Sequence, residues 1–161
     1  MKNRIRIALA AMLTVTLMAT PAMAATPPDY GDALDCLFVG LTNGPDSDPD
    51  MVAALDLTFQ ASIAEAAGDL LGAADLLAQA RDLLEDAEDT TPADCTGAMA
   101  STTGDLARYA IELWEEAGAK AKDVDNAQKH IDRGDKHLAK GRSAKALDEY
   151  RRALERAVKG L

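Results

Sequence analysis

The chain has little of what catalytic sites and aromatic cores usually require. Of its 161 residues, 4% are aromatic, two are histidine, two are cysteine and one is tryptophan. Alanine is abundant instead, and small side chains allow helices to pack at short interaxial distances. The composition therefore favours a core of closely packed helices over an aromatic-rich β-sandwich.

The sequence also lacks the motifs of common enzyme classes. It contains no H-E-x-x-H, G-x-S-x-G, P-loop or dinucleotide-binding glycine pattern. His130 and His137 are seven residues apart, which in a helix separates their backbones by about 10.5 Å, too far to share a zinc ion as an i, i+4 pair does. Ser143, in GRSAK, follows no predicted strand, so we interpret it as a helix cap. The sequence predicts a protein that is not an enzyme and has no cofactor.

One segment resembles part of a calcium loop. Aspartates alternate in DSDPD (46–50), and alternate aspartates can offer oxygen ligands to a hard cation. An EF-hand loop would also need glycine and glutamate at the positions of Met51 and Leu57. Asp48 followed by Pro49 is instead the order of a helix start, with the capping acceptor first. We predict no metal site.

The first residues have the layout of a secretory signal peptide. Three basic residues among the first six precede an apolar stretch over 7–18 and small residues over 22–24, which predicts cleavage after Ala24. An uncleaved membrane anchor is the alternative, but the apolar stretch is shorter than the roughly 20 residues that a membrane span needs. No later stretch is long and apolar enough for a span. We expect a secreted or periplasmic protein without stable membrane insertion after cleavage.

Export determines how the two cysteines are interpreted. Disulfides persist outside the reducing cytosol, so we predict that Cys36 and Cys95 are paired. The pair would remove roughly 4 kcal/mol of chain entropy from the unfolded state in the simple loop model. The two cysteines do not form a C-x-x-C motif, which argues against redox catalysis.

The hydrophobic pattern has the period of helices. Apolar residues recur every three or four positions, and no segment alternates with the period of two that strands require. This predicts an all-α fold, a bundle of five or six helices. Helices are expected over 32–41 and, after a loop that carries Cys95, over 99–119. The last two helices are expected to start at Asp125, in a pattern similar to a capping box, and at Ser143.

Residues 49–88 carry the longest apolar stripe. A single helix over these residues would be about 60 Å long at 1.5 Å per residue. That length is unusual for a domain of this size, so we expect a break or a kink near Gly68 and Gly72, and one continuous helix is the alternative. The stripe consists of Phe59, Ile63, Ala66, Leu70, Ala73, Leu77, Ala80, Leu84 and Ala87.

Charge is divided unevenly along the chain. Residues 25–119 contain 20 acidic and two basic residues, whereas residues 120–161 contain 12 basic and seven acidic residues. The chain accordingly divides into a signal peptide (1–24), an acidic helical region (25–122) and a basic helical hairpin (123–161). Two arrangements of the hairpin remain open: it docks on the acidic region, or it presents a positive surface to an acidic partner.

The hairpin resembles a single tetratricopeptide repeat over residues 127–158. Such a repeat is a helix-turn-helix with small residues where its helices cross and larger residues between them. The residues that carry the resemblance are Gly134, the turn glycine Gly141, and the spacing of Ala146, Tyr150 and Ala153. A weaker echo of these offsets occurs upstream at Gly68, Ala80, Leu84 and Ala87. The chain departs from the family pattern at His130, Arg133 and His137, and no proline closes the repeat.

The resemblance implies partner binding, because members of that family are mostly scaffolds that hold peptides or proteins along their first helices. The partner-binding residues that we predict are His130, Arg133, Lys136, His137 and Lys140. We expect an unknown protein or peptide partner, and the positive charge of the hairpin would attract one that is acidic. Nucleic acid is disfavoured by export and by the net charge of −10.

The sequence thus predicts an exported, non-enzymatic protein–protein interaction module. One alternative is a structural or stress-related envelope protein that self-associates through the stripe over 59–87. Another is a secreted enzyme or effector whose site has no recognisable motif.

Overall fold

The computed structural model describes residues 25–43, 49–86 and 93–161. Within these residues the chain forms six α-helices and no strand, which confirms the predicted all-α bundle. The helices are α1 (Gly31–Asn43), α2 (Pro49–Ala66), α3 (Leu70–Asp86), α4 (Ala93–Glu116), α5 (Ala121–Leu138) and α6 (Ser143–Gly160). The predicted signal peptide (1–24) lies outside the described residues.

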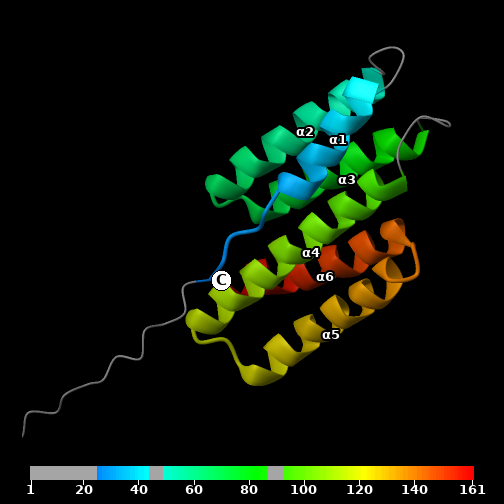
Figure 1. Ribbon diagram of the computed structural model, residues 1–161. Coiled ribbons are helices and arrows are strands. Elements are labelled where there is room, and N and C mark those ends of the chain that lie inside the picture. The colour runs from blue at the N-terminus through cyan, green and yellow to red at the C-terminus, as the bar shows by residue number, and fades with distance from the viewer. Residues whose placement is uncertain (1–24, 44–48, 87–92) are drawn as a thin grey trace, which may run out of the picture.

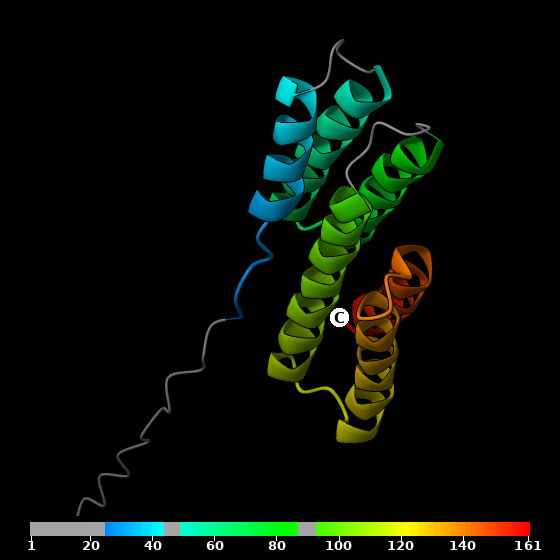
Figure 2. The same cartoon turned by 45° about the vertical axis from the view of Figure 1, so that its right-hand side comes forward.

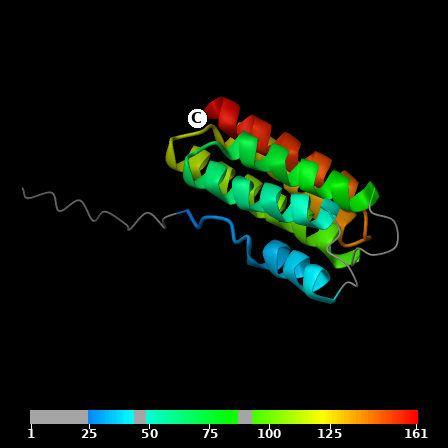
Figure 3. The ribbon, with the colours of Figure 1, turned by 90° about the horizontal axis from the view of Figure 1, so that it is seen from above.

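The helices lie side by side in one elongated bundle (Figures 1 and 2). α3 and α4 occupy its middle: α1 packs on α2 and α4, and α6 packs on α3, α4 and α5. Seen from above, α1 and α6 lie on opposite sides of the bundle (Figure 3). No helix within the described ranges combines the length and the apolar character that a bilayer crossing demands.

The long predicted helix is broken at Gly68, as expected. Gly68 has a φ of +84°, a conformation that side-chain-bearing residues rarely adopt, and its N–H donates to the Glu65 carbonyl at 2.8 Å. The turn reverses the chain, so α2 and α3 pack against each other as a hairpin.

This reversal changes which part of the predicted stripe is buried. Leu70, Leu77 and Leu84 of α3 are buried, but Phe59 and Ile63 of α2 are 49% and 66% exposed. The stripe was predicted as one packing surface, and for α2 that prediction is wrong. Because the chain reverses at Gly68, a different side of α2 is buried. The buried residues of α2 are Met51, Ala54, Thr58 and Ala61.

The buried residues form two clusters. The larger one joins residues of α2, α3, α4, α5 and α6 and includes Leu77, Leu106, Ile131 and Leu154. The smaller one joins α1, α2, α3 and α4 around Leu37. Because the hairpin contributes to the larger cluster, it shares a core with the acidic region and is not a separate unit.

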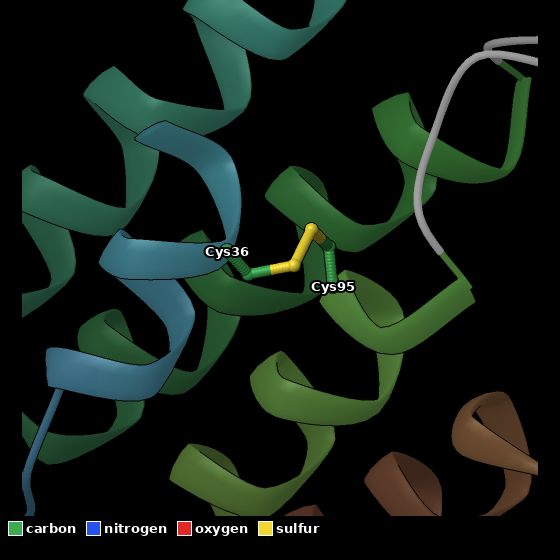
Figure 4. The surroundings of a disulfide bond; sticks show 2 residues. All are labelled: Cys36 and Cys95. Atoms are coloured by element: carbon green, nitrogen blue, oxygen red, sulfur yellow. A yellow bond between two sulfur atoms is a disulfide. The ribbon is translucent and has the colours of Figure 1, made fainter. Parts of the chain in front are cut away.

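Cys36 of α1 and Cys95 of α4 form the predicted disulfide, with Cα atoms 5.4 Å apart (Figure 4). Cys95 was expected in a loop but lies in the first turn of α4, where it is fully buried. The bond therefore joins two helices within the smaller cluster.

The last helix begins at Ser143, as predicted, but the predicted start at Asp125 and the predicted capping role of Ser143 are wrong. α5 begins at Ala121, because the N–H groups of Asp123 and Val124 already donate to the Lys120 carbonyl. Asp125 is therefore an interior residue of α5, and the predicted boundary after residue 122 falls inside this helix. Ser143 does not cap α6; its hydroxyl donates to Thr96 Oγ1 of α4 at 3.4 Å.

Candidate partner-binding face

The α5–α6 hairpin has one apolar side and one charged side. The apolar sides of α5 and α6 pack against each other and against α4. The buried residues are Val124, Ala127, Ile131 and Gly134 of α5, and Ala146, Leu147, Tyr150, Ala153, Leu154 and Ala157 of α6. We call the opposite, solvent-facing side the outer face. It consists of Lys129, His130, Arg133, Lys136, His137 and Lys140, and of Lys145, Glu149, Arg152, Arg156 and Lys159.

Tyr150 fixes the hairpin on α4. Its side chain is 1% exposed, and its ring lies against Gly134 of α5 and Gly104 of α4. The Tyr150 hydroxyl donates to Asp135 Oδ1 at 2.6 Å. Arg108 of α4 donates to the same oxygen at 2.5 Å, and its guanidinium carbon lies 5.8 Å from the centre of the Tyr150 ring.

If the basic hairpin docked on the acidic region through charge alone, its cations would face carboxylates of that region. In this contact the two charges have the opposite arrangement. The cation, Arg108, comes from the acidic region, and the carboxylate, Asp135, comes from the basic hairpin. Burial opposes the charge of Arg108, but the hydrogen bond and negative charge of Asp135, with the charge of Asp105, outweigh burial and raise its pKa. One contact does have the expected direction: Arg151 of α6 lies 2.7 Å from Asp75 of α3.

At the centre of the outer face, Glu149 gathers three basic side chains. Glu149 Oε2 lies 2.7 Å from His130 Nδ1 and 3.7 Å from Arg133 Nη1, and Arg152 donates to Glu149 Oε1 at 3.1 Å. Burial alone would raise the pKa of Glu149, but the hydrogen bond to His130 and the positive charges of His130, Arg152 and Arg133 outweigh burial and lower it. Glu149 of α6 therefore links α6 to His130 and Arg133 of α5. Its single negative charge is smaller than the positive charge of the basic side chains that contact it.

The predicted binding residues lie along one side of α5 and its following turn. His130 and Arg133 meet at Glu149. Lys136 and Lys140 are exposed, and among the described residues neither takes part in an ion pair. His137 is half-buried, and its Nδ1 atom is buried with no hydrogen-bond partner in the described part of the chain.

The sequence prediction did not include the cations that α6 adds. Arg152, Arg156 and Lys159 follow one another at i, i+4 and i+7, which places them on one side of a helix. With His130 and Glu155 they line a hollow of about 270 Å³, which we call the seam pocket. The spacing of these cations can be read from the segment RRALERAVK. Their position beside α5 depends on how α5 and α6 pack against each other, which the segment does not show.

Much of the positive charge on the outer face is not balanced within the chain. Arg133, Arg152 and Lys159 pair with glutamates of the hairpin itself. Among the residues that the structure describes, Lys129, Lys136, Lys140, Lys145 and Arg156 of this face enter no ion pair. The hairpin thus packs inward through its apolar side, while most of its lysines and arginines enter no ion pair with a described carboxylate.

Within the described ranges, no group of three or more histidine, cysteine, aspartate or glutamate side chains is placed to hold a metal ion. Asp46 and Asp48 of the alternating aspartates lie outside those ranges, and Asp50 lies in the first turn of α2.

Comparison of the chain with protein-family models, with curated proteins and with solved structures gives no match.

Proposed function

We propose that this protein is an exported, non-enzymatic interaction module that binds an acidic protein or peptide through the outer face of α5 and α6. One observation carries the proposal: among the described residues, several cations of this face have no carboxylate partner in their own chain. Positive charge that is not neutralised internally remains available to a partner of opposite charge.

The uneven charge of the chain supports an orientation for this binding. Residues 25–119 carry 20 acidic and two basic residues, so they repel an acidic partner. The hairpin attracts the same partner, and the two effects together would steer it toward the outer face. Such steering raises the association rate and weakens as salt is added.

Export is supported by two features. The first 24 residues have the layout of a signal peptide, and the bundle contains the Cys36–Cys95 disulfide, which is typical of oxidising compartments. We propose a secreted or periplasmic location on these grounds.

The packing inside the hairpin supports its proposed likeness to a tetratricopeptide repeat. Gly134, Ala146 and Ala153 are buried on the apolar sides of α5 and α6, and the Tyr150 ring of α6 lies against Gly134 of α5. The upstream echo has a different structure, because Gly68 lies in a turn whereas Gly134 lies inside a helix. We therefore propose one such hairpin, stacked on α4, and not an array of repeats.

The test is affinity capture from an extract of the native cell envelope. The variant Lys136→Glu/Lys140→Glu reverses two outer-face charges that enter no described ion pair. The matched control, Lys120→Glu/Lys122→Glu, reverses two exposed lysines at the other end of α5. We expect the first variant to lose the acidic partner and the control to retain it. Equal recovery by the wild type and both variants would contradict the proposal.

Self-association is a second candidate function, and one observation favours it. Val52, Phe59 and Ile63 are 47%, 49% and 66% exposed, and their spacing places them on one side of α2. A role in self-association requires the wild type to be oligomeric and Phe59→Asp/Ile63→Asp to be monomeric by light scattering at tens of micromolar. A wild type that is strictly monomeric would exclude this candidate.

A further inference from the structure

We infer that the seam pocket is an oxyanion site, which takes a side-chain carboxylate of the acidic partner with Arg156 as its main ligand. The inference rests on the proposed function and adds to it a specific place and chemistry of contact. The pocket lies where α5 and α6 meet and is lined by His130, Arg152, Glu155, Arg156 and Lys159.

The first argument is the arrangement of the cations. Arg152 and Lys159 lie four residues before and three residues after Arg156 on the same helix. At 1.5 Å per residue, the three backbone positions are separated by about 6 Å and about 4.5 Å along the helix axis. An anion beside Arg156 would therefore lie near Arg152 and Lys159, each of which also pairs with one glutamate of the hairpin.

The second argument is that the carboxylates nearby are already engaged. Glu149 is held by His130, Arg133 and Arg152. Glu155 lies 3.7 Å from Arg151 Nε and 3.6 Å from Lys159 Nζ. Arg156 enters no ion pair among the described residues, so the pocket keeps a positive charge without an internal counterion.

The third argument is the chemistry of the guanidinium group. Its planar fork of N–H donors matches the two oxygens of a carboxylate or two oxygens of a phosphate, and such bidentate contacts are stronger than contacts to a single point charge. Arg156 is exposed, so its fork is available to solvent and to a ligand. Of the two sources of an oxyanion, the proposed acidic protein partner supplies carboxylates.

The test uses a fluorescent oligoglutamate peptide and measures its binding to the disulfide-bonded wild-type chain by fluorescence anisotropy at low salt. The variant Arg156→Gln removes the proposed ligand. The control, Arg142→Gln, removes an arginine of the same hairpin that is exposed, lies outside the pocket and enters no described ion pair. We expect Arg156→Gln to weaken binding at least about tenfold, as the loss of a charged hydrogen bond does, and Arg142→Gln to weaken it less than about twofold.

Two further arms test the assignment of chemistry. Arg156→Lys keeps the charge but loses the fork, so we expect it to bind several-fold more weakly than the wild type. Acetate should displace the peptide better than chloride at the same ionic strength, because a carboxylate can accept from both arms of the fork and chloride cannot. Equal displacement by acetate and chloride would overturn the carboxylate site, and wild-type affinity of Arg156→Lys would overturn the bidentate contact.

The outcomes also separate this inference from the proposed function. Equal weakening by Arg156→Gln and Arg142→Gln would mean that charge acts diffusely, which overturns the pocket and leaves the proposed function standing. A wild type that does not bind oligoglutamate would overturn the pocket as a carboxylate site. The proposed function fails separately, if envelope capture is unaffected by Lys136→Glu/Lys140→Glu.

Discussion

The ring of Tyr150 lies so close to Gly134 that a β-carbon at position 134 would be 2.3 Å from the Cε1 atom of the ring. Atoms cannot approach to that distance, and the ring is enclosed, with 1% of the tyrosine exposed. The position of α5 on α6 therefore depends on the absence of a side chain at residue 134.

This contact predicts that Gly134→Ala destabilises the fold. Inserting a methyl group into a packed site forces side chains or backbone to move, at a cost of about 1–3 kcal/mol. Gly97→Ala is the control, because Gly97 also lies inside a helix but has no atom within 4 Å of the added carbon. We expect a lower urea midpoint for Gly134→Ala and an equal or higher one for Gly97→Ala. Equal midpoints for Gly134→Ala and the wild type would contradict the close contact.

The hydroxyl of Tyr150 predicts a dependence of stability on alkaline pH. Burial, followed by the hydrogen bond and charge of Asp135, raises the pKa of Tyr150. A tyrosine with a raised folded-state pKa contributes stability that is complete below about pH 10, where unfolded tyrosine ionises, and is lost as pH rises toward the folded-state pKa.

We therefore expect the free energy of unfolding to fall above about pH 10, and to fall less steeply in Tyr150→Phe. Burial and the charge of Glu65 also raise the pKa of Tyr30, so part of the slope should remain in the variant. Below pH 9, loss of the hydrogen bond to Asp135 should cost about 1 kcal/mol. Urea unfolding at a series of pH values measures both effects, and identical slopes in the two proteins would refute the assignment.

Glu149 predicts the opposite behaviour in acid. Its pKa is lowered in the folded protein, so the stability that it contributes is present above about pH 4.3, where unfolded glutamate titrates, and is lost as pH falls toward the folded-state pKa. Glu149→Gln should therefore lose less stability than the wild type between pH 5 and pH 3. Glu115→Gln, at an exposed position of α4, provides the control. If Glu149→Gln and the wild type lose stability in parallel, the contacts around Glu149 do not form as described.

The disulfide predicts a large effect of reduction. The bond between Cys36 and Cys95 closes a separation of 59 residues, and a cross-link of that size contributes about 2–4 kcal/mol. We expect a reductant to lower the melting temperature of the wild type and to leave Cys36→Ser/Cys95→Ser unchanged. A thiol titration of the unreduced protein should find no free thiol, and two free thiols would exclude the bond.

Much of the architecture could be predicted because local signals and packing agree. The period of the apolar residues predicts helices, Gly68 and Gly72 together predict the region of the break between α2 and α3, and the two cysteines in an exported chain predict their bond. The side of α2 that is buried could not be predicted in this way. Met51, Ala54, Thr58 and Ala61 have helical spacing, but so do Val52, Phe59 and Ile63, and the turn at Gly68 decides between the two sides.

The candidate site was predictable only within a single helix. His130 and Arg133 belong to one side of α5 by their spacing alone. Arg152 and Arg156 join them through the pairing of α5 with α6, which the contact of Tyr150 with Gly134 sets. The ion pair between Arg108 and Asp135 joins a basic residue of the acidic region to an acidic residue of the basic hairpin. It is a tertiary contact, and no local sequence pattern indicates it.

The central claim is that an acidic partner covers the outer face, and lysine footprinting tests it most directly. The described lysines all lie in residues 120–161, so an acylating reagent reports on the hairpin with and without the partner recovered by capture. The claim predicts that Lys136 and Lys140 lose reactivity when the partner is bound, while Lys120 and Lys122 keep theirs. Undiminished reactivity of Lys136 and Lys140 in the saturated complex would contradict it.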